Sequence, residues 1–419
     1  MRLLEVRSGR YAGRMRFALA VVILTFSTAQ AITPKQVDDA ARHAQNGLRS
    51  VVKKLSSKKL EGRDNGTPGS LGARTYLIRQ LRRLGVGANG GGKSDAAYQQ
   101  AFTFAGQSGT NIVAVMPGSD LAGEYVMIGA HYDHLDSRSM PDGTCFANGT
   151  PGGEICNGAA DNASGVAATL AIAKAIKKIG PTRRSVILAF WDAEEDQLNG
   201  SAYYAANPLV PNAAVKGYVN FDIQGANLLP SIKTVSFAVG AETGGAAFES
   251  LVDGAVQAEG FETQLLSYIF GQLRSDYVNL VGVGIPTVFF TDANNGCYHT
   301  VNDDIQFVDF KKLRTQTHIA FRTVLALTET DTPPAFAPPA ATLARFTDLE
   351  RVAAILERGR ADLSLFSAAD QALLTAHDTT LQAILADGPD AFDSGDVGTL
   401  LGAAIDVVNA LRHVPCQKF

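Results

Sequence analysis

The sequence predicts an α/β fold, with a mixed, mostly parallel central sheet covered by helices on both faces and a small helical appendage at the C-terminus. Three observations lead to this prediction. Apolar runs of strand length at residues 125–128 and 186–190 are bounded by polar residues, as in strands that are buried on both faces. Such runs alternate along the chain with segments of helical period. Beyond Thr330, paired prolines precede an alanine- and leucine-rich stretch of helical period.

The first elements expected along the chain are helices. Apolar residues at helical spacing predict one helix over residues 34–55. A second, amphipathic helix is expected over residues 71–84. Thr67 is its candidate N-cap, and Pro68 suits the first helical position because proline lacks the N–H that would have no partner there.

The remaining elements alternate between strands and helices. An apolar helix rich in small residues is expected over residues 165–179, where Gly180 and Pro181 stop it. The other strands are expected at residues 102–104, 111–116, 215–221, 234–239 and 286–290, and the other helices at residues 245–259 and 307–327.

Composition indicates an ordinary globular protein. The chain has 419 residues, of which 46% are hydrophobic and 19% charged, so it is long enough for one large core and an accessory region. Its formal net charge is −4 and its pI is near 6.0. Neither value gives a reason to expect nucleic acid or an anionic membrane as a partner.

The first 31 residues resemble a secretory signal peptide. Basic residues precede an apolar stretch at residues 17–24, which is too short to span a bilayer, and an Ala-x-Ala sequence follows at residues 29–31. We therefore expect a secreted or periplasmic protein with no stable membrane insertion after signal cleavage. The alternatives are an uncleaved anchor and a buried first helix.

These patterns divide the chain into four parts. They are a signal peptide at residues 1–31, a main α/β domain at 32–330, a proline-rich linker at 331–342 and a helical C-terminal region at 343–419. The C-terminal region contains His377 and His413 but no cluster of acids and histidines, so a structural or docking role is expected for it.

The four cysteines, Cys145, Cys156, Cys297 and Cys416, fit no zinc-thiolate spacing. In an exported protein they are expected to form disulfides. Cys145 and Cys156 are the favoured pair because both lie in one loop, although three connectivities remain open.

Acids and histidines follow the apolar runs of the expected sheet. They are His131, Asp161, Glu195, Asp222 and His299. Because open α/β sheets bind ligands at the carboxyl ends of their strands, we expect these side chains to meet there. Imidazole and carboxylate ligands suit zinc, with manganese or cobalt as alternatives. A two-metal site would need one carboxylate to bridge the ions and a shared water to act as nucleophile.

Five short segments resemble one family in their order. They are H-Y-D-H at residues 131–134, A-D-N-A-S-G at 160–165, A-E-E at 193–195, N-F-D at 220–222 and C-Y-H-T at 297–300. These are similar to the signatures of the dizinc aminopeptidase family, of the secreted bacterial leucyl aminopeptidase and aminopeptidase Y type. The resemblance covers roughly residues 55–327 and implies a zinc-exopeptidase-like fold.

The resemblance implies a role for each ligand. Asp161 would bridge two zinc ions, His131 and Asp222 would complete one site, and Glu195 and His299 would complete the other.

Three further residues receive roles beside the metals. Glu194 would be the general base, since that task needs a carboxylate close to the metals but not bound to them. Asp133 is the candidate partner that orients His131, and Tyr298 is a candidate hydrogen-bond donor to the oxyanion. His134 is interpreted as structural.

The function expected from these residues is that of a secreted dinuclear zinc aminopeptidase. It would hydrolyse the N-terminal peptide bond of a peptide or protein with a free N-terminus, through a metal-bridging hydroxide and a glutamate general base. The alternatives are a carboxypeptidase or dipeptidase on the same metal core, a single-zinc transferase similar to glutaminyl cyclase, and a non-catalytic binding module.

Overall fold

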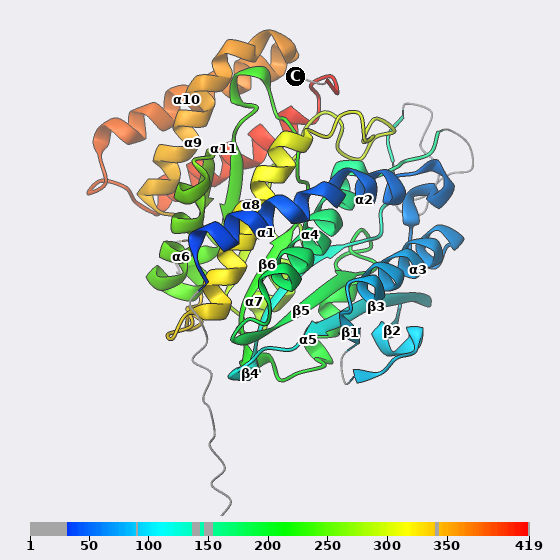
Figure 1. Ribbon diagram of the computed structural model, residues 1–419. Helices are drawn as coiled ribbons and strands as arrows, with labels where there is room; N and C mark the ends of the chain where they lie inside the picture. The colour runs from blue at the N-terminus through cyan, green and yellow to red at the C-terminus, as the bar shows by residue number, and fades with distance from the viewer. Residues whose placement is uncertain (1–31, 89–90, 136–142, 146–153, 340–342, 418–419) are drawn as a thin grey trace, which may run out of the picture.

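The structure is a computed structural model that describes residues 32–88, 91–135, 143–145, 154–339 and 343–417 (Figure 1). The expected signal peptide at residues 1–31 lies outside the described residues. Among the described residues, no helix combines the length and the apolar character needed to cross a membrane.

The described strands form one mixed sheet. They are β1 (Gly87–Ala88), β2 (Gln99–Phe104), β3 (Gln107–Met116), β4 (Leu121–His131), β5 (Arg184–Trp191), β6 (Val215–Phe221), β7 (Ser236–Val239), β8 (Thr263–Leu266) and β9 (Thr287–Thr291). Their order is β1-β3-β5-β4-β6-β9-β7-β8, with β2 paired to β3. The central strands β5, β4, β6 and β9 run parallel, whereas β3 and β7 join them by antiparallel pairing. The predicted mixed α/β sheet is confirmed.

Helices cover both faces of this sheet. They are α1 (Pro34–Ala44), α2 (Leu48–Leu55), α3 (Pro68–Arg83), α4 (Ser164–Ile179), α5 (Asn199–Ala206), α6 (Gly245–Glu259), α7 (Tyr277–Gly282), α8 (Phe310–Glu329), α9 (Phe346–Gly359), α10 (Ala368–Asp387) and α11 (Ser394–Leu411). Helices α1, α2, α4 and α8 share the larger apolar core with one face of the sheet (Figure 1). Helices α5 and α7 pack on the other face, around Trp191 and Tyr218.

The capping residues of α3 agree with the sequence prediction, whereas the first expected helix differs from it. Thr67 caps α3 by accepting a hydrogen bond from the backbone N–H of Ser70, and Pro68 is the first helical residue. The single helix expected over residues 34–55 is instead two helices, α1 and α2, joined by a short 3₁₀ turn at Gln45–Gly47. Glycine and asparagine are poor helix formers, which accounts for the break at this point.

Four short elements, β1, α5, α7 and β8, are absent from the sequence prediction. Each is too short to show a clear period of its own. Strand β8 pairs in parallel with β7 over four residues, so its place in the sheet depends on that neighbour.

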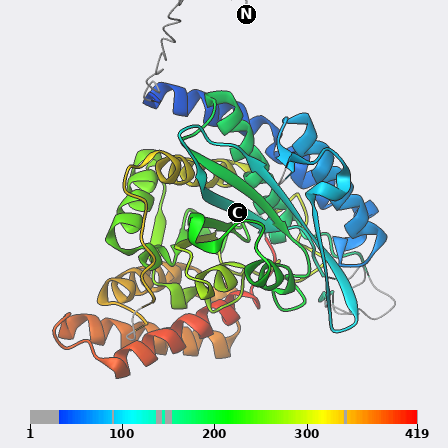
Figure 2. The same ribbon diagram turned by 90° about the horizontal axis from the view of Figure 1, so that it is seen from below.

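The C-terminal helices pack against the β7–β8 side of the sheet, where Figure 2 shows them in orange and red. They share an apolar core of their own, to which residues 228–235 of the main domain also contribute. Polar contacts join the two parts. The Asp348 carboxylate accepts a hydrogen bond of 2.7 Å from the Ser267 hydroxyl, and Arg345 forms an ion pair of 2.6 Å with Glu249. The C-terminal helices therefore pack on the α/β domain through both apolar and polar contacts.

Candidate metal centre

The site lies where three parallel strands end. His131 is the last residue of β4, Glu194 and Glu195 follow β5, and Asp222 follows β6. These strands are neighbours, with β4 between β5 and β6, so their carboxyl ends meet at one edge of the sheet. The structure thus brings together side chains from positions 91 residues apart in the sequence.

Asp161 is held by the turn that leads into α4. Gly158 has φ of 58°, and a Cβ atom there would lie 2.3 Å from the carbonyl oxygen of Asp161 and 2.5 Å from Cγ of His134. Only glycine fits such a position. The Asp303 carboxylate accepts hydrogen bonds from the backbone N–H groups of Ala160 and Asp161, at 2.7 and 2.9 Å. Asp303 therefore orients the turn.

The two carboxylate oxygens of Asp161 face two different imidazoles. Its Oδ1 lies 3.3 Å from Nε2 of His131, which is also 3.2 Å from Oδ1 of Asp222. Its Oδ2 lies 3.2 Å from Nε2 of His299, which is also 3.3 Å from Oε2 of Glu195. Asp161 is therefore central to two groups of potential ligands.

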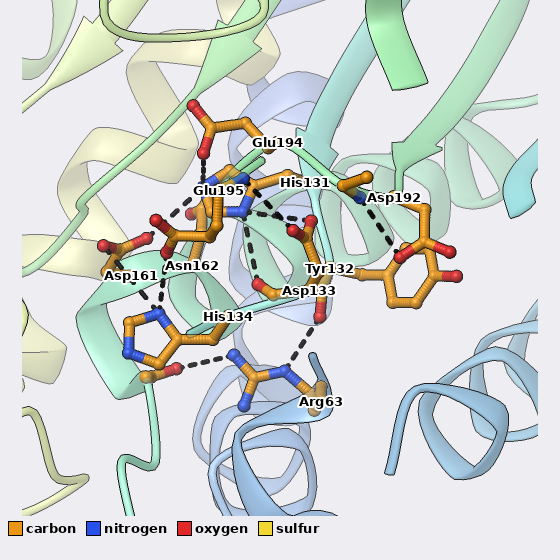
Figure 3. Close-up of polar contacts among 12 residues, drawn as sticks. Arg63, His131, Tyr132, Asp133, His134, Asp161, Asn162, Asp192, Glu194 and Glu195 are labelled. Carbon is orange, nitrogen blue, oxygen red and sulfur yellow. Dashed lines mark hydrogen bonds and ion pairs between the residues drawn. The ribbon is translucent and has the colours of Figure 1, made fainter. Parts of the chain in front are cut away.

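Glu194 and Glu195 are adjacent but point to different partners. Ala193 before them has φ of 54°, a left-handed conformation that turns the chain sharply at the end of β5. Glu195 contacts His134, whereas Oε2 of Glu194 lies 3.8 Å from Nε2 of His131 (Figure 3). Glu195 also contacts His299, with Oε2 3.3 Å from Nε2. Glu194 lines the pocket beside the cluster. One of the two glutamates can therefore bind a metal while the other remains free.

Asp133 and Tyr298 lie beside the cluster. Oδ1 of Asp133 is 3.5 Å from Nδ1 of His131, and its Oδ2 accepts a hydrogen bond from the backbone N–H of Glu195. The backbone carbonyl of Asp133 lies 3.2 Å from the same Nδ1 atom, so it is a second candidate for orienting the imidazole. The Tyr298 ring stacks on His299, with the ring centroids 3.7 Å apart, and it lines the pocket.

Two disulfides hold the loop that carries His299. Cys145 pairs with Cys156, as favoured from the sequence, and Cys297 pairs with Cys416. The backbone N–H of Cys145 donates a hydrogen bond of 2.8 Å to the carbonyl oxygen of His299. Because Cys297 lies two residues before His299, both cross-links restrict this loop.

Burial and neighbouring charges shift the pKa values of the acids in the cluster in opposite directions. Burial acts to raise the pKa of Asp161, but hydrogen bonds with His131 and His299 outweigh it and hold that pKa well below the usual value. Burial and the charge of Asp161 act to raise the pKa of Glu195, yet His299 and His134 lower it to about 2.

Glu194 shows the opposite behaviour. Burial raises its pKa well above the usual value, and the neighbouring charges of Asp222 and Glu195 add to this effect, although His131 opposes it. Burial raises the pKa of Asp222 as well, but its Oδ1 lies nearer to Nε2 of His131, at 3.2 Å against 3.8 Å for Oε2 of Glu194. Glu194 is therefore the acid better suited to stay free of metal and to accept and return a proton.

The residues present fit metal ions. Ligand atoms of His131, Asp161 and Asp222 lie within 4.8 Å of one another, and so do those of His134, Asp161 and Glu195. In the described part of the chain, no lysine or arginine forms an ion pair with Asp161, Glu194, Glu195 or Asp222; their partners within 4 Å are histidines. Buried carboxylates in such number need compensating positive charge, and nitrogen and oxygen donors in this mixture suit zinc.

Residues 111–324 match the model of peptidase family M28. The chain belongs to this family. M28 is a family of zinc-dependent peptidases, which are hydrolases. The expected membership of the zinc exopeptidases is confirmed.

The chain is similar to one protein named for inactivating leupeptin and to another named as an aminopeptidase. Leupeptin-inactivating enzyme 1 of Streptomyces exfoliatus is 31% identical to this M28 peptidase over 228 residues, which are 52% of this chain and 45% of that protein. An aminopeptidase of Pseudomonas aeruginosa strain UCBPP-PA14 is 32% identical over 166 residues, which are 38% of this chain and 27% of that protein. The matches thus span less than half the length of either relative.

Solved structures show the same fold. Legionella pneumophila LapA aminopeptidase aligns with a TM-score of 0.55 at 17% identity, over 72% of this chain and 76% of that one. Porphyromonas gingivalis glutaminyl cyclase aligns with a TM-score of 0.53 at 19% identity, over 67% of this chain and 97% of that one. At these identities the likeness concerns the fold alone.

The sequence interpretation missed two residues of this M28 peptidase site. His134, which it treated as structural, is fully buried with Nδ1 2.9 Å from Oε1 of Glu195. Arg63 is also fully buried, and its guanidinium donates to the backbone carbonyl oxygen of Tyr132 (Figure 3). It donates as well to the backbone carbonyl oxygens of Leu55, Asn157 and Gly158. The second histidine of H-Y-D-H was a signal for the first of these, whereas no local pattern marked Arg63 as a link between the loops beside His131 and Asp161.

Proposed function

We propose that this M28 peptidase is a dinuclear zinc aminopeptidase that hydrolyses the first peptide bond of substrates with a free N-terminus. The observation that carries the proposal is the position of Asp161, whose two oxygens face His131 and His299 separately, at 3.3 and 3.2 Å. A carboxylate shared in this way suits a bridge between two ions.

Each ligand has a proposed place. His131 and Asp222 would hold one zinc ion, Glu195 and His299 the other, and Asp161 both. When bound, zinc polarises a substrate carbonyl and lowers the pKa of water, which is the chemistry that peptide hydrolysis requires.

The remaining steps belong to side chains of the chain itself. Glu194 takes a proton from the attacking water and passes it to the leaving amine, a role supported by its burial beside His131 and by its raised pKa. Tyr298 donates a hydrogen bond from its hydroxyl to the oxyanion that forms on the scissile carbonyl, a role supported by its place in the same pocket. Asp133 keeps His131 in one orientation.

Export of the mature chain is part of the proposal. Its support is the signal-like first 31 residues together with two disulfides, since disulfides persist in oxidising compartments.

One observation favours a second candidate, a dipeptidase or carboxypeptidase. Arg274 is exposed and lines the same pocket as Glu194. A guanidinium there could bind the C-terminal carboxylate of a short substrate. Both candidates use the same metal residues and differ in which end of the substrate must be free.

Glutaminyl cyclase chemistry and a non-catalytic role are weaker candidates. A single-zinc transferase would have no need for both His131 and His299 beside Asp161. A binding module would have no need for Glu194, an acid with a raised pKa that lines the pocket and lies 3.8 Å from Nε2 of His131 in addition to the proposed ligands.

The test is hydrolysis of matched peptides by the purified mature chain. The panel contains free-amino, N-acetylated and C-amidated forms of one sequence, assayed with zinc and after chelation. The aminopeptidase proposal expects cleavage of the free-amino forms, amidated or not, and loss of cleavage on acetylation or chelation. Cleavage that requires a free C-terminus would instead establish the second candidate.

The variant Glu194→Gln separates chemistry from metal binding. We expect kcat to fall by about 10²–10⁴-fold while the chain still binds two zinc ions. Glu357→Gln is the matched control, because Glu357 is an exposed acid on α9, and it should behave as the wild type. Wild-type protein that binds zinc but cleaves no peptide would contradict the proposal.

A further inference from the structure

Beyond the metal ligands, the pocket at the metal centre has apolar walls. Phe270, Phe289 and Ala293 of the main domain line it, together with Val408. Val408 belongs to α11, which lies beyond residue 324, where the match to the family ends. A residue of the C-terminal helical region thus borders the same space as Glu194 and Asp161.

An apolar hollow adjoins this pocket. It extends between the sheet and the C-terminal helices, past Phe237 of β7 and Ala404 of α11. The residues that it shares with the pocket are Phe270, Gln272, Thr291, Ala293 and Val408. Apart from Gln272 and Thr291, the residues that line it are apolar, in contrast to the carboxylates on the metal side. The combined space therefore has an acidic end and an apolar end, with Val408 at the boundary.

Three contacts fix α11 in this position. Cys416, which follows α11, is cross-linked to Cys297. A Cβ atom on Gly296 would lie 1.7 Å from the carbonyl oxygen of Val414, so the two backbones touch. The guanidinium of Arg412 lies over the Tyr298 ring, 5.3 Å from its centroid. The end of α11 is thus attached to the loop that carries Tyr298 and His299.

From these contacts we infer that α11 supplies one wall of the pocket for the side chain of the substrate's N-terminal residue, and that Val408 limits the size of that side chain. The inference rests on the proposed aminopeptidase function. With the scissile carbonyl at the acidic end, the apolar end is the space next to it that can bury an aliphatic or aromatic group. Burial of such a group is favourable in proportion to its apolar area. The C-terminal helical region is therefore a specificity element in addition to a structural one.

The experiment compares kcat/KM for phenylalanyl and alanyl p-nitroanilides in full-length mature protein. Val408→Phe narrows the pocket and should lower the ratio of kcat/KM for the phenylalanyl substrate to kcat/KM for the alanyl substrate by about tenfold or more. The reason is that a misfit of one methylene group in a hydrophobic pocket already changes kcat/KM by about tenfold. Val408→Ala widens the pocket and should raise the same ratio. A ratio is used because partial misfolding lowers both values equally.

Ile405→Ala is the matched control. Ile405 lies on the same helix, 43% exposed, and does not line the pocket. This variant should keep the wild-type ratio. If both Val408 variants keep that ratio as well, or if Ile405→Ala shifts it as much as they do, the inference is wrong.

A binding measurement gives a second readout. In the Glu194→Gln background, titration calorimetry with L-phenylalaninamide and L-alaninamide should show that Val408→Phe weakens binding of the first only. Equal weakening of both amides would contradict a role in size selection. If the proposed aminopeptidase function itself were wrong, wild-type protein would cleave neither p-nitroanilide. That result differs from an unchanged substrate ratio in the Val408 variants, so the two failures can be distinguished.

Discussion

The imidazole of His134 contacts Glu195, with Nδ1 2.9 Å from Oε1, and its ring is fully buried. His134 also lies 3.9 Å from Oδ2 of Asp161. A neutral imidazole that donates to a carboxylate fixes the direction of the oxygen lone pairs that remain for a metal. His134 is therefore placed to orient two proposed ligands of one ion.

We expect His134→Ala to weaken zinc binding at that site by about 10–100-fold, the usual effect of losing a residue that orients a metal ligand. Competition with a zinc-sensitive chelator measures the affinity. His318→Ala is the control, since His318 pairs with Glu259 outside the cluster, at 3.5 Å. Equal zinc affinities in the two variants would show that His134 is only a packing residue.

Tyr298→Phe should lower kcat by about 10²–10³-fold with little change in KM, because the variant loses one hydrogen bond to the oxyanion. The phenyl ring keeps the stacking on His299, so the change tests the hydroxyl group alone. Tyr203→Phe is the control, as that ring stacks on Phe102 in another part of the molecule. An unchanged kcat would assign Tyr298 to packing.

The stability of the chelated protein should depend on the protonation of His299. Burial acts to lower the pKa of His299, but Glu195 and Asp161 raise it from 6.5 to about 10. A pKa that rises on folding stabilises the fold fully below pH 6.5, and this contribution is lost as the pH rises towards 10.

Urea denaturation at a series of pH values measures this effect. The free energy of unfolding of the chelated protein should fall across that window, and it should fall less in His299→Gln. Zinc-loaded protein should show a smaller dependence, because a metal-bound imidazole is already deprotonated. Parallel curves for the chelated wild type and the variant would refute the assignment.

The long disulfide should contribute more to stability than the short one. Cys297 and Cys416 are 119 residues apart, whereas Cys145 and Cys156 are 11 apart. Loop-closure entropy predicts that the double variant Cys297→Ser/Cys416→Ser loses about 2 kcal/mol more free energy of unfolding than Cys145→Ser/Cys156→Ser.

Chemical denaturation of the two double variants tests the difference. The first variant should also bind zinc more weakly, because it frees the loop that carries His299. A larger loss in the short-loop variant would show that contacts in the Cys145 loop, and not chain entropy, dominate.

Sequence patterns predicted the elements that carry the site. The apolar runs before His131 and Asp222 are strands β4 and β6, and both residues stand at strand ends as expected. Parallel strands place their carboxyl ends at one edge of a sheet, so side chains from separate segments could be expected to meet there. The prediction failed for β8, whose four residues are too few to show a period.

The order of short motifs also identified the family correctly, although each motif alone carries little information. The motifs do not indicate where their side chains point. The histidines of H-Y-D-H are three residues apart, and nothing in the sequence indicates that both point into the cluster.

The sequence by itself therefore determined the α/β class, the family and the residue types available for a metal site. Only the tertiary structure decided that His134 and Arg63 belong to this site, that Cys297 pairs with Cys416, and that Val408 borders the pocket. Helical and strand periods arise from residues a few positions apart, so local sequence records them. The contact of α11 with the metal-site pocket joins segments more than 100 residues apart, and it depends on how complete layers pack, which no local pattern records.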